Sequence, residues 1–205
     1  MLVAESLIIV LLILLNGFFA LAEMALVSAK RGRLQSSAER GSRGARMALE
    51  LLADSTTFLS SVQVGITLIG ILTGVYSGAT FAEGLGGWFA ARGVDADIAE
   101  ELAFGVVVLL VTFGTLVFGE LVPKRIALTH AESLAIFVAP IMAVFARLML
   151  PLVWLLRISV DSILRILPVS AAPAASVTED EVRALIAEGA RTGVFLASER
   201  RLIEG

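Results

Sequence analysis

The chain alternates long apolar runs with short polar segments, and this pattern predicts its helices. Three runs reach the roughly 20 residues that a helix needs to cross the hydrocarbon core of a membrane. They lie at about residues 2–29, 58–81 and 101–123, and a short amphipathic segment at about 45–53 precedes the second run. We therefore expect three membrane-spanning helices.

The first run could be mistaken for a secretory signal, because Leu7 to Leu15 resembles its apolar centre and Ala20-Leu21-Ala22 resembles a cleavage site. A secretory signal carries its basic residues before the apolar centre. Here the run is preceded by Glu5, and the basic residues follow it: Lys30, Arg31, Arg33, Arg40, Arg43 and Arg46. The first run therefore predicts a retained span.

A fourth apolar region, at 134–167, leaves two interpretations open. Its prolines and charged residues divide it into short pieces: Pro140, Arg147, Pro151, Arg157, Asp161 and Arg165. One interpretation is a fourth span near residues 135–156 with a buried Arg147. The other is a pair of juxtamembrane helices, at about 131–167, that lie along the cytoplasmic interface with their arginines reaching the headgroups. The charges favour the pair.

The sequence changes character after Pro168. A Pro/Ala/Ser linker at 169–176 leads to an acidic segment at 177–205, where Thr178 and Glu181 have the spacing of a helix-capping box. We expect a short soluble helical bundle there. The predicted fold is an all-α polytopic membrane protein with a transmembrane domain at 1–168.

Composition agrees with this fold and excludes several kinds of site. Apolar residues make up 58% of the 205, and charged residues only 17%, against roughly 25% in a soluble chain. The mean hydropathy is +0.91. The absence of cysteine and the single histidine, His130, exclude thiolate and histidine-rich metal sites. The net charge of −3 gives no indication of a nucleic-acid partner.

The distribution of charge predicts the topology. Basic residues follow the first span and the third, where Lys124 and Arg125 lie, whereas the connection at 83–101 is acidic. Cytoplasmic loops of membrane proteins are rich in Lys and Arg. We expect a multi-pass protein of the cell membrane with its N-terminus outside, and with its basic loop and C-terminus in the cytoplasm.

Polar groups inside the spans are the first candidates for function, because they are costly in lipid. In the first span Asn16, Ala20 and Glu23 share one helix face. Glu23 suggests a lined cavity or a bound cation, although it could also be solvated at the cytoplasmic interface. In the second span Ser60 and Ser61 offer hydroxyl oxygens, and Gly65 leaves the backbone accessible to an ion.

The third span contains a predicted helix break. Pro123 cannot donate a hydrogen bond to the carbonyl of Gly119, so the helix should kink and free that oxygen beside Glu120. Carboxylate, hydroxyl and carbonyl oxygens favour Mg²⁺, Ca²⁺ or Na⁺ over a soft metal. The competing interpretation is a structural ion pair between Glu120 and Lys124, four residues apart.

Glycines recur every four residues in the second span, at Gly70, Gly74 and Gly78. Small residues at this spacing let helices approach closely in lipid. We interpret this series as a helix-packing surface.

Several segments together resemble the CorC/CNNM (cyclin-M) family. They are LNGFFALAEMALVS at 15–28, FLSSVQVGIT at 58–67, FGELVPK at 118–124, TEDEVR at 178–183 and ERRLIE at 199–204. The resemblance covers nearly the whole chain. It implies a homodimeric Mg²⁺ transporter that exports the ion, with three spans followed by juxtamembrane helices on the cytoplasmic side.

The same resemblance implies a site and further partners. The metal ligands would come from Asn16, Ala20, Glu23, Ser60, Ser61, Gly65, Gly119 and Glu120, with Pro123 shaping the backbone. Many relatives have serine where Ala20 stands, so one hydroxyl ligand is missing. The acidic helices would lead to cytoplasmic CBS domains that bind ATP. We expect the chain to stop before those domains, so no ATP site is expected in it.

These observations give two functional hypotheses. The first is Mg²⁺ transport, with export as the expected direction and Na⁺ as the candidate coupling ion. The second is a membrane-anchored Mg²⁺ sensor or scaffold that regulates another transporter. An enzyme is not expected, because the sequence has no HExxH motif and no second intramembrane acid spaced as a dyad partner.

Overall fold

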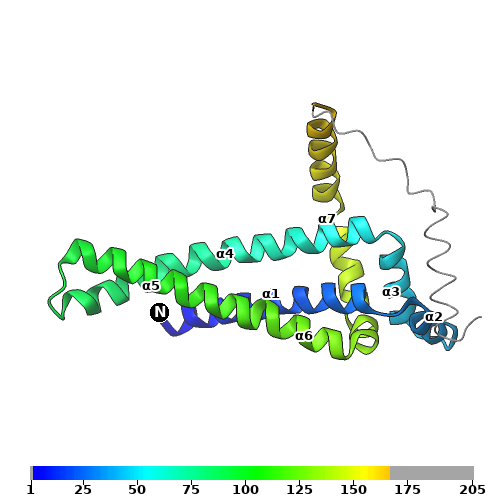
Figure 1. The fold of residues 1–205 in the computed structure, drawn as a ribbon, viewed down its shortest axis with the longest axis horizontal. Helices are drawn as coiled ribbons and strands as arrows, with labels where there is room; N and C mark the ends of the chain where they lie inside the picture. Colours follow the sequence, from blue (N-terminus) through cyan, green and yellow to red (C-terminus); the bar gives the residue numbers. More distant parts are fainter. Residues whose placement is uncertain (1, 167–205) are drawn as a thin grey trace, which may run out of the picture. The chain divides into compact units, whose positions relative to one another are not determined.

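The computed structural model describes residues 2–166, and the chain is helical throughout that range apart from short turns. This confirms the all-α fold class. The elements are α1 (Leu2–Ser28), α2 (Arg31–Glu39), α3 (Arg43–Ala53), α4 (Ser55–Ala90), α5 (Ala96–Leu116), the π-helical turn η1 (Val117–Leu121), α6 (Val122–Thr129) and α7 (Ala131–Ile166) (Figure 1). The predicted linker and acidic helices lie outside the described residues.

Four helical stretches in the described residues are long and apolar enough to cross a membrane. They are Ala4–Ser28, Ser55–Ala90, Ala96–Thr129 and Ala131–Ile166. The first lies within the predicted span at 2–29, whereas the second and third include the predicted spans at 58–81 and 101–123 and are longer than the sequence pattern indicated. The third is continuous through α5, η1 and α6.

The connection expected at 83–101 is much shorter than predicted. Only residues 91–95 lie outside α4 and α5, because Glu83 continues α4 and the acids from Asp97 onward belong to α5. Asp95 caps α5 by accepting a hydrogen bond from the Asp97 N–H at 3.1 Å. Gly93 adopts a φ of +93°, a conformation that side-chain-bearing residues rarely adopt. The two helices therefore form a tight hairpin.

Helix α1 packs against α4 on one side and against η1 and α6 on another. Its buried face carries small residues, so the helices approach closely; Ala22, Ala25 and Leu26 are fully buried there. Phe58 and Val62 of α4 complete this part of the core. In Figure 1, α1, α4 and α5 run alongside one another.

The first half of α7 packs against the segments around α2 and α3. Its buried stripe repeats every three or four residues and consists of Ala131, Ala135, Val138, Ala139 and Met142. Arg33 forms an ion pair with Glu132 at 3.5 Å, and Gly44 lies against the backbone of Ile136. Up to Arg157, the yellow part of α7 crosses the direction of α1 and α4 (Figure 1).

The region predicted as a pair of helices is one helix in the structure. Pro140 and Pro151 both lie inside α7 without ending it. Arg147, which the four-span interpretation would bury, is exposed. Residues 158–166 continue the helix as part of a second unit of the chain.

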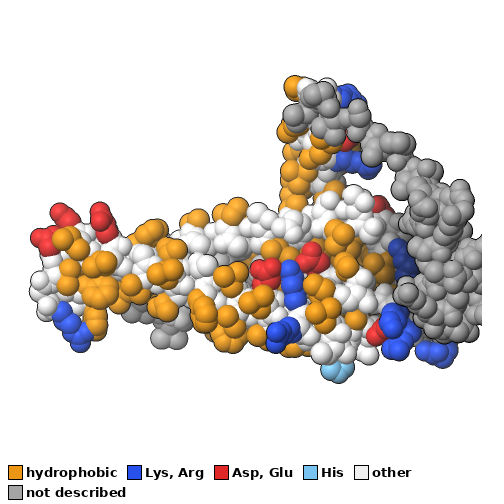
Figure 2. Space-filling view, in the orientation of Figure 1, with side chains coloured by type: hydrophobic (Ala, Val, Ile, Leu, Met, Phe, Trp, Pro, Cys, Tyr) orange, Lys and Arg blue, Asp and Glu red, His pale blue; other side chains and the backbone are white. Residues whose placement is uncertain are grey.

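Large apolar side chains are exposed along the helices (Figure 2). On α4 and α5, Ile71, Val75, Leu109 and Phe113 expose 59–71% of their surface. Soluble monomers rarely expose apolar surface on this scale. These helices therefore have surfaces suited to lipid or to other apolar partners.

Candidate functional site

The helix break predicted at Pro123 is present, and it takes the form of a π-helical turn. Pro123 has no N–H to donate to the carbonyl of Gly119, four residues earlier. Over η1 the hydrogen bonds run five residues back, as from the Val122 N–H to the Val117 carbonyl. The backbone stays helical, but the Gly119 carbonyl becomes available to a partner from another helix.

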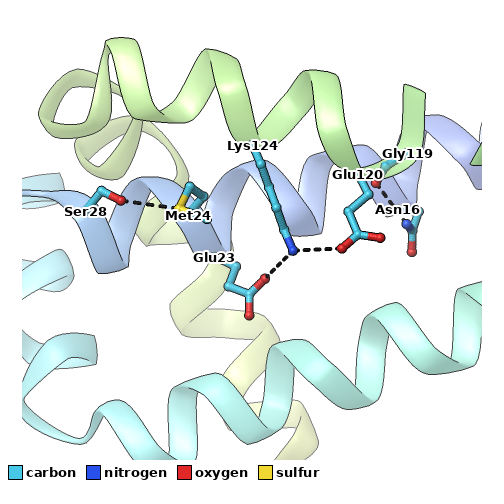
Figure 3. A network of polar contacts seen from close by, with 7 residues as sticks. All are labelled: Asn16, Glu23, Met24, Ser28, Gly119, Glu120 and Lys124. Carbon is cyan, nitrogen blue, oxygen red and sulfur yellow. Dashed lines mark hydrogen bonds and ion pairs between the residues drawn. The ribbon is translucent and has the colours of Figure 1, made fainter. Parts of the chain in front are cut away.

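That partner is Asn16 of α1. Its Nδ2 donates a hydrogen bond to the Gly119 carbonyl oxygen at 2.9 Å (Figure 3). Asn16 is only 5% exposed, and its Oδ1 has no hydrogen-bond partner within the described part of the chain. A buried acceptor without a donor costs about 1–3 kcal/mol. The amide thus supplies the freed carbonyl with a donor and leaves its own oxygen available.

Glycine on both sides allows this close approach. A Cβ atom at Gly17 would lie 2.9 Å from the Phe118 carbonyl oxygen and 3.0 Å from Cγ of Pro123. A Cβ at Gly119 would lie 3.2 Å from Nδ2 of Asn16. Pro123 itself is buried. The backbones of α1 and η1 therefore meet where only glycine fits comfortably.

Two carboxylates lie beside this contact and share one ammonium. Nζ of Lys124 lies 2.9 Å from Oε1 of Glu120 and 3.6 Å from Oε2 of Glu23. Figure 3 shows the two carboxylates on either side of the lysine. The side chains are 23% (Glu23), 43% (Glu120) and 28% (Lys124) exposed. The pair between Glu120 and Lys124, which the sequence offered as a competing interpretation, is present and extends to Glu23.

The cluster carries one net negative charge, because two carboxylates face one ammonium. Within residues 2–166 no group of three or more His, Cys, Asp or Glu could hold a metal. A cation here would therefore depend on two carboxylates together with neutral oxygens. Asn16 Oδ1 is the neutral oxygen that the structure leaves without a donor.

The remaining predicted ligands are not joined to this cluster by any hydrogen bond in the described chain. Ala20 is buried on the α1 face that carries Asn16 and Glu23, but it has no side-chain oxygen. Ser61 is buried and donates to the Thr57 carbonyl at 2.8 Å, and Ser60 is half-buried. Gly65 packs against Phe145 and Phe19, whose rings meet edge to face at 4.6 Å. Gly65 therefore has a packing role in this chain.

The sequence matches the family described as "Cyclin M transmembrane N-terminal domain" over residues 7–199. The chain belongs to this family. Its membership, together with the long apolar helices, identifies it as a membrane protein.

Relatives of this cyclin M chain come from several bacteria. It is 44% identical over 200 residues to the UPF0053 protein sll0260 of Synechocystis, covering 98% of this chain and 45% of the relative. It is 29% identical to proteins named "Polyamine export protein" of Haemophilus influenzae and Salmonella typhimurium, covering 96% of this chain in both cases and 45% and 44% of those relatives. The chain thus spans about half the length of the curated relatives it matches.

The three glycines of the α4 series, Gly70, Gly74 and Gly78, differ in whether another helix packs against them. A Cβ at Gly78 would contact Phe104 of α5 at 3.3 Å, as the packing interpretation requires. A Cβ at Gly70 or Gly74 would meet no other atom within 4 Å. Both line a cavity of about 170 Å³ between α4 and α5, with Thr73, Val111, Thr112, Thr115 and Leu116. Close packing at these two glycines stays a prediction about neighbours outside this chain.

Proposed function

We propose that this chain is the membrane domain of a Mg²⁺ transporter and that it holds the ion where α1 packs against η1. The observation that carries the proposal is the unpartnered Oδ1 of Asn16, a buried oxygen of an amide that bonds Gly119, the residue next to Glu120. An oxygen of this kind favours a cation, and carboxylate and amide oxygens are ligands of hard divalent ions. Intramembrane acids also mark ion pathways.

The residues have separate tasks in this proposal. Glu23 and Glu120 supply the charge that attracts a divalent ion, and Asn16 supplies a neutral oxygen. The hydrogen bond from Asn16 Nδ2 to Gly119 fixes the orientation of the amide. Mg²⁺ releases its waters reluctantly and usually keeps several. The partial exposure of both carboxylates leaves room for those waters.

The orientation in the membrane follows from charge. A dense group of basic residues lies at 30–46, in and around α2 and α3, and the α4–α5 hairpin carries acids at the opposite end of α4 (Figure 2). By the positive-inside rule, α2 and α3 are cytoplasmic and the hairpin turn is outside. The first part of α7, which crosses the direction of α1, then lies along the cytoplasmic interface. Export, coupling to Na⁺ and a homodimeric assembly complete the proposal.

A polyamine is the second candidate cargo. Two relatives carry the name "Polyamine export protein". In this chain the two carboxylates already hold a primary ammonium on an alkyl stem, that of Lys124. The end of a polyamine has the same chemistry. A carboxylate pair that binds one alkylammonium group can therefore bind an organic cation as well as an inorganic one.

The test is ion flux by the purified chain in liposomes. We expect entrapped dye to report Mg²⁺ movement, and we expect Glu120→Gln to abolish it. Glu101→Gln, which removes an exposed carboxylate of α5 far from the break, serves as the matched control. Spermidine flux without Mg²⁺ flux would select the polyamine. Mg²⁺ binding without any flux would favour the membrane-anchored sensor or scaffold.

A further inference from the structure

We propose that the ammonium of Lys124 is a tethered cation that occupies the Glu23–Glu120 pair in the empty site and leaves when the transported cation binds. The inference rests on the proposed function, because it concerns the same site. It adds a feature that neither the transport activity nor the ligand set requires: the site carries its own competitor.

The first step is the pairing of two acids from different helices. Glu23 comes from α1 and Glu120 from η1, and both lie in stretches apolar enough to span a membrane. Neighbouring carboxylates repel one another, and their charge is costly in lipid. A counter-cation is therefore needed whenever no ion is bound. Lys124 Nζ, at 2.9 Å and 3.6 Å from the two carboxylates, fills that role.

The second step is the balance of charge. With Lys124 in place, the cluster has one net negative charge. A divalent cation added to it would leave one excess positive charge and would lie against the ammonium. If Lys124 leaves, the divalent ion and the two carboxylates are neutral together. In a medium of low dielectric constant this difference is large, so binding of the ion and departure of the lysine are coupled.

The third step is the freedom of Lys124 to leave and return. Its side chain is 28% exposed and has a flexible four-carbon stem, so the ammonium can move into water while its backbone stays fixed. Glu120 precedes Lys124 by four residues on the same helical stretch, so the ammonium stays within reach of the Glu120 carboxylate and can return to it. The pair with Glu23 is the ion pair that joins α1 to α6 in the described chain. Displacement therefore releases a contact between helices.

The sequence offers a direct measurement of this displacement. Lys30 and Lys124 are the only two lysines of the chain, and Lys30 is exposed between α1 and α2. An amine-reactive acetylating reagent, read by peptide mass spectrometry, compares the two within one sample. We expect MgCl₂ to raise the acetylation rate of Lys124 severalfold while the rate at Lys30 stays constant. In Glu120→Gln, acetylation of Lys124 should be fast and should not depend on Mg²⁺.

The Kd for Mg²⁺ of Lys124 variants provides a second, independent test of the displacement. Lys124→Met removes the competitor, so we expect its Kd for Mg²⁺ to fall by about tenfold, an ordinary size for coupling between two binding events. Arg125→Met removes the same charge from the exposed neighbouring residue and should leave the Kd unchanged. Lys124→Arg should bind Mg²⁺ no more tightly than the original chain. Spermidine, titrated in the same way, should follow the same order.

The possible failures are distinct. If Lys124 is a permanent structural clamp, Lys124→Met will bind Mg²⁺ as weakly as the original chain or more weakly, and MgCl₂ will not expose Lys124 to acetylation. Either result overturns the inference while Glu120→Gln still loses binding. If Glu120→Gln binds Mg²⁺ as the original chain does, the proposed site itself is wrong. Labelling of the original chain decides the inference even if Lys124→Met does not fold.

Discussion

The side chain of Asn16 takes the place of the N–H that Pro123 lacks. The proline cannot supply the N–H that a regular α-helix would place four residues after Gly119, and Asn16 Nδ2 donates to the Gly119 carbonyl from α1 at 2.9 Å. One residue of the first span therefore compensates for a helix break more than one hundred residues later.

Asn16 should link stability to ion binding. Asn16→Ala removes the side-chain donor to the buried Gly119 carbonyl, so we expect a loss of about 1–3 kcal/mol in unfolding free energy and no stabilisation by Mg²⁺. Asn16→Asp loses the donor but keeps an oxygen, so it should be less stable yet still stabilised by Mg²⁺. Thermal unfolding in detergent, with and without MgCl₂, measures both effects.

The control for Asn16 is Gln63→Ala, which removes an exposed side-chain amide from α4. It should unfold as the original chain does at every Mg²⁺ concentration. A normal Mg²⁺-dependent shift in Asn16→Ala would show that Oδ1 is not a ligand.

Pro123→Ala should weaken Mg²⁺ binding without lowering the thermal stability of the fold. The alanine N–H can reach the Gly119 carbonyl, which restores the ordinary helical hydrogen bond and displaces Asn16 Nδ2. We expect thermal stability in detergent to be kept, since alanine is the better helix former. Mg²⁺ affinity, measured by calorimetry, should fall. Unchanged affinity would mean that the break is not needed to build the site.

Gly17 and Gly70 form a matched pair for close packing. A Cβ at Gly17 would lie 2.9 Å from the Phe118 carbonyl oxygen, whereas a Cβ at Gly70 has nothing within 4 Å. We expect Gly17→Ala to lower the unfolding free energy by about 1–3 kcal/mol. Gly70→Ala should be neutral or stabilising by up to about 1 kcal/mol. A clear loss at Gly70, measured in the same thermal assay, would place another chain against it.

The position of α7 in the membrane can be tested without background, because the sequence has no cysteine. His130 directly precedes α7 and Arg157 lies in its second half, and both are exposed. Single cysteines at these two positions should both react with a membrane-impermeant thiol reagent added on the cytoplasmic side. Arg33→Cys and Arg92→Cys give the inside and outside references. Labelling of positions 130 and 157 from opposite sides would make α7 a fourth span.

Local chemistry predicted the break, but three-dimensional proximity could not be read from the sequence. Pro123 and Gly119 are four residues apart, so the freed carbonyl follows from covalent structure alone. The ion pair between Glu23 and Lys124 depends on which helix faces α1, and no residue pattern contains that information. The pair with Glu120 was foreseeable because its partners lie one helical turn apart.

Other predictions depended on the context of whole helices. Pro140 and Pro151 suggested two helices, yet α7 continues through both, and its buried residues, from Ala131 to Val153, extend past the two prolines. Ser60 and Ser61 entered the candidate site through the family resemblance, and the structure gives Ser61 a partner inside its own helix, the Thr57 carbonyl. Their role as ligands stays a prediction.

The glycine contact between α1 and η1 also restricts how this domain can move. At Gly17 the backbone of α1 approaches the Phe118 carbonyl so closely that an added Cβ would lie 2.9 Å from its oxygen. A rearrangement that keeps this contact moves α1 and η1 together, and Asn16 then keeps its hydrogen bond to Gly119. Relative motion is easier along α4 and α5, where Gly70 and Gly74 border a cavity. Access to the ion from the two sides of the membrane would then be governed by α4, a helix that contributes no charge to the ion.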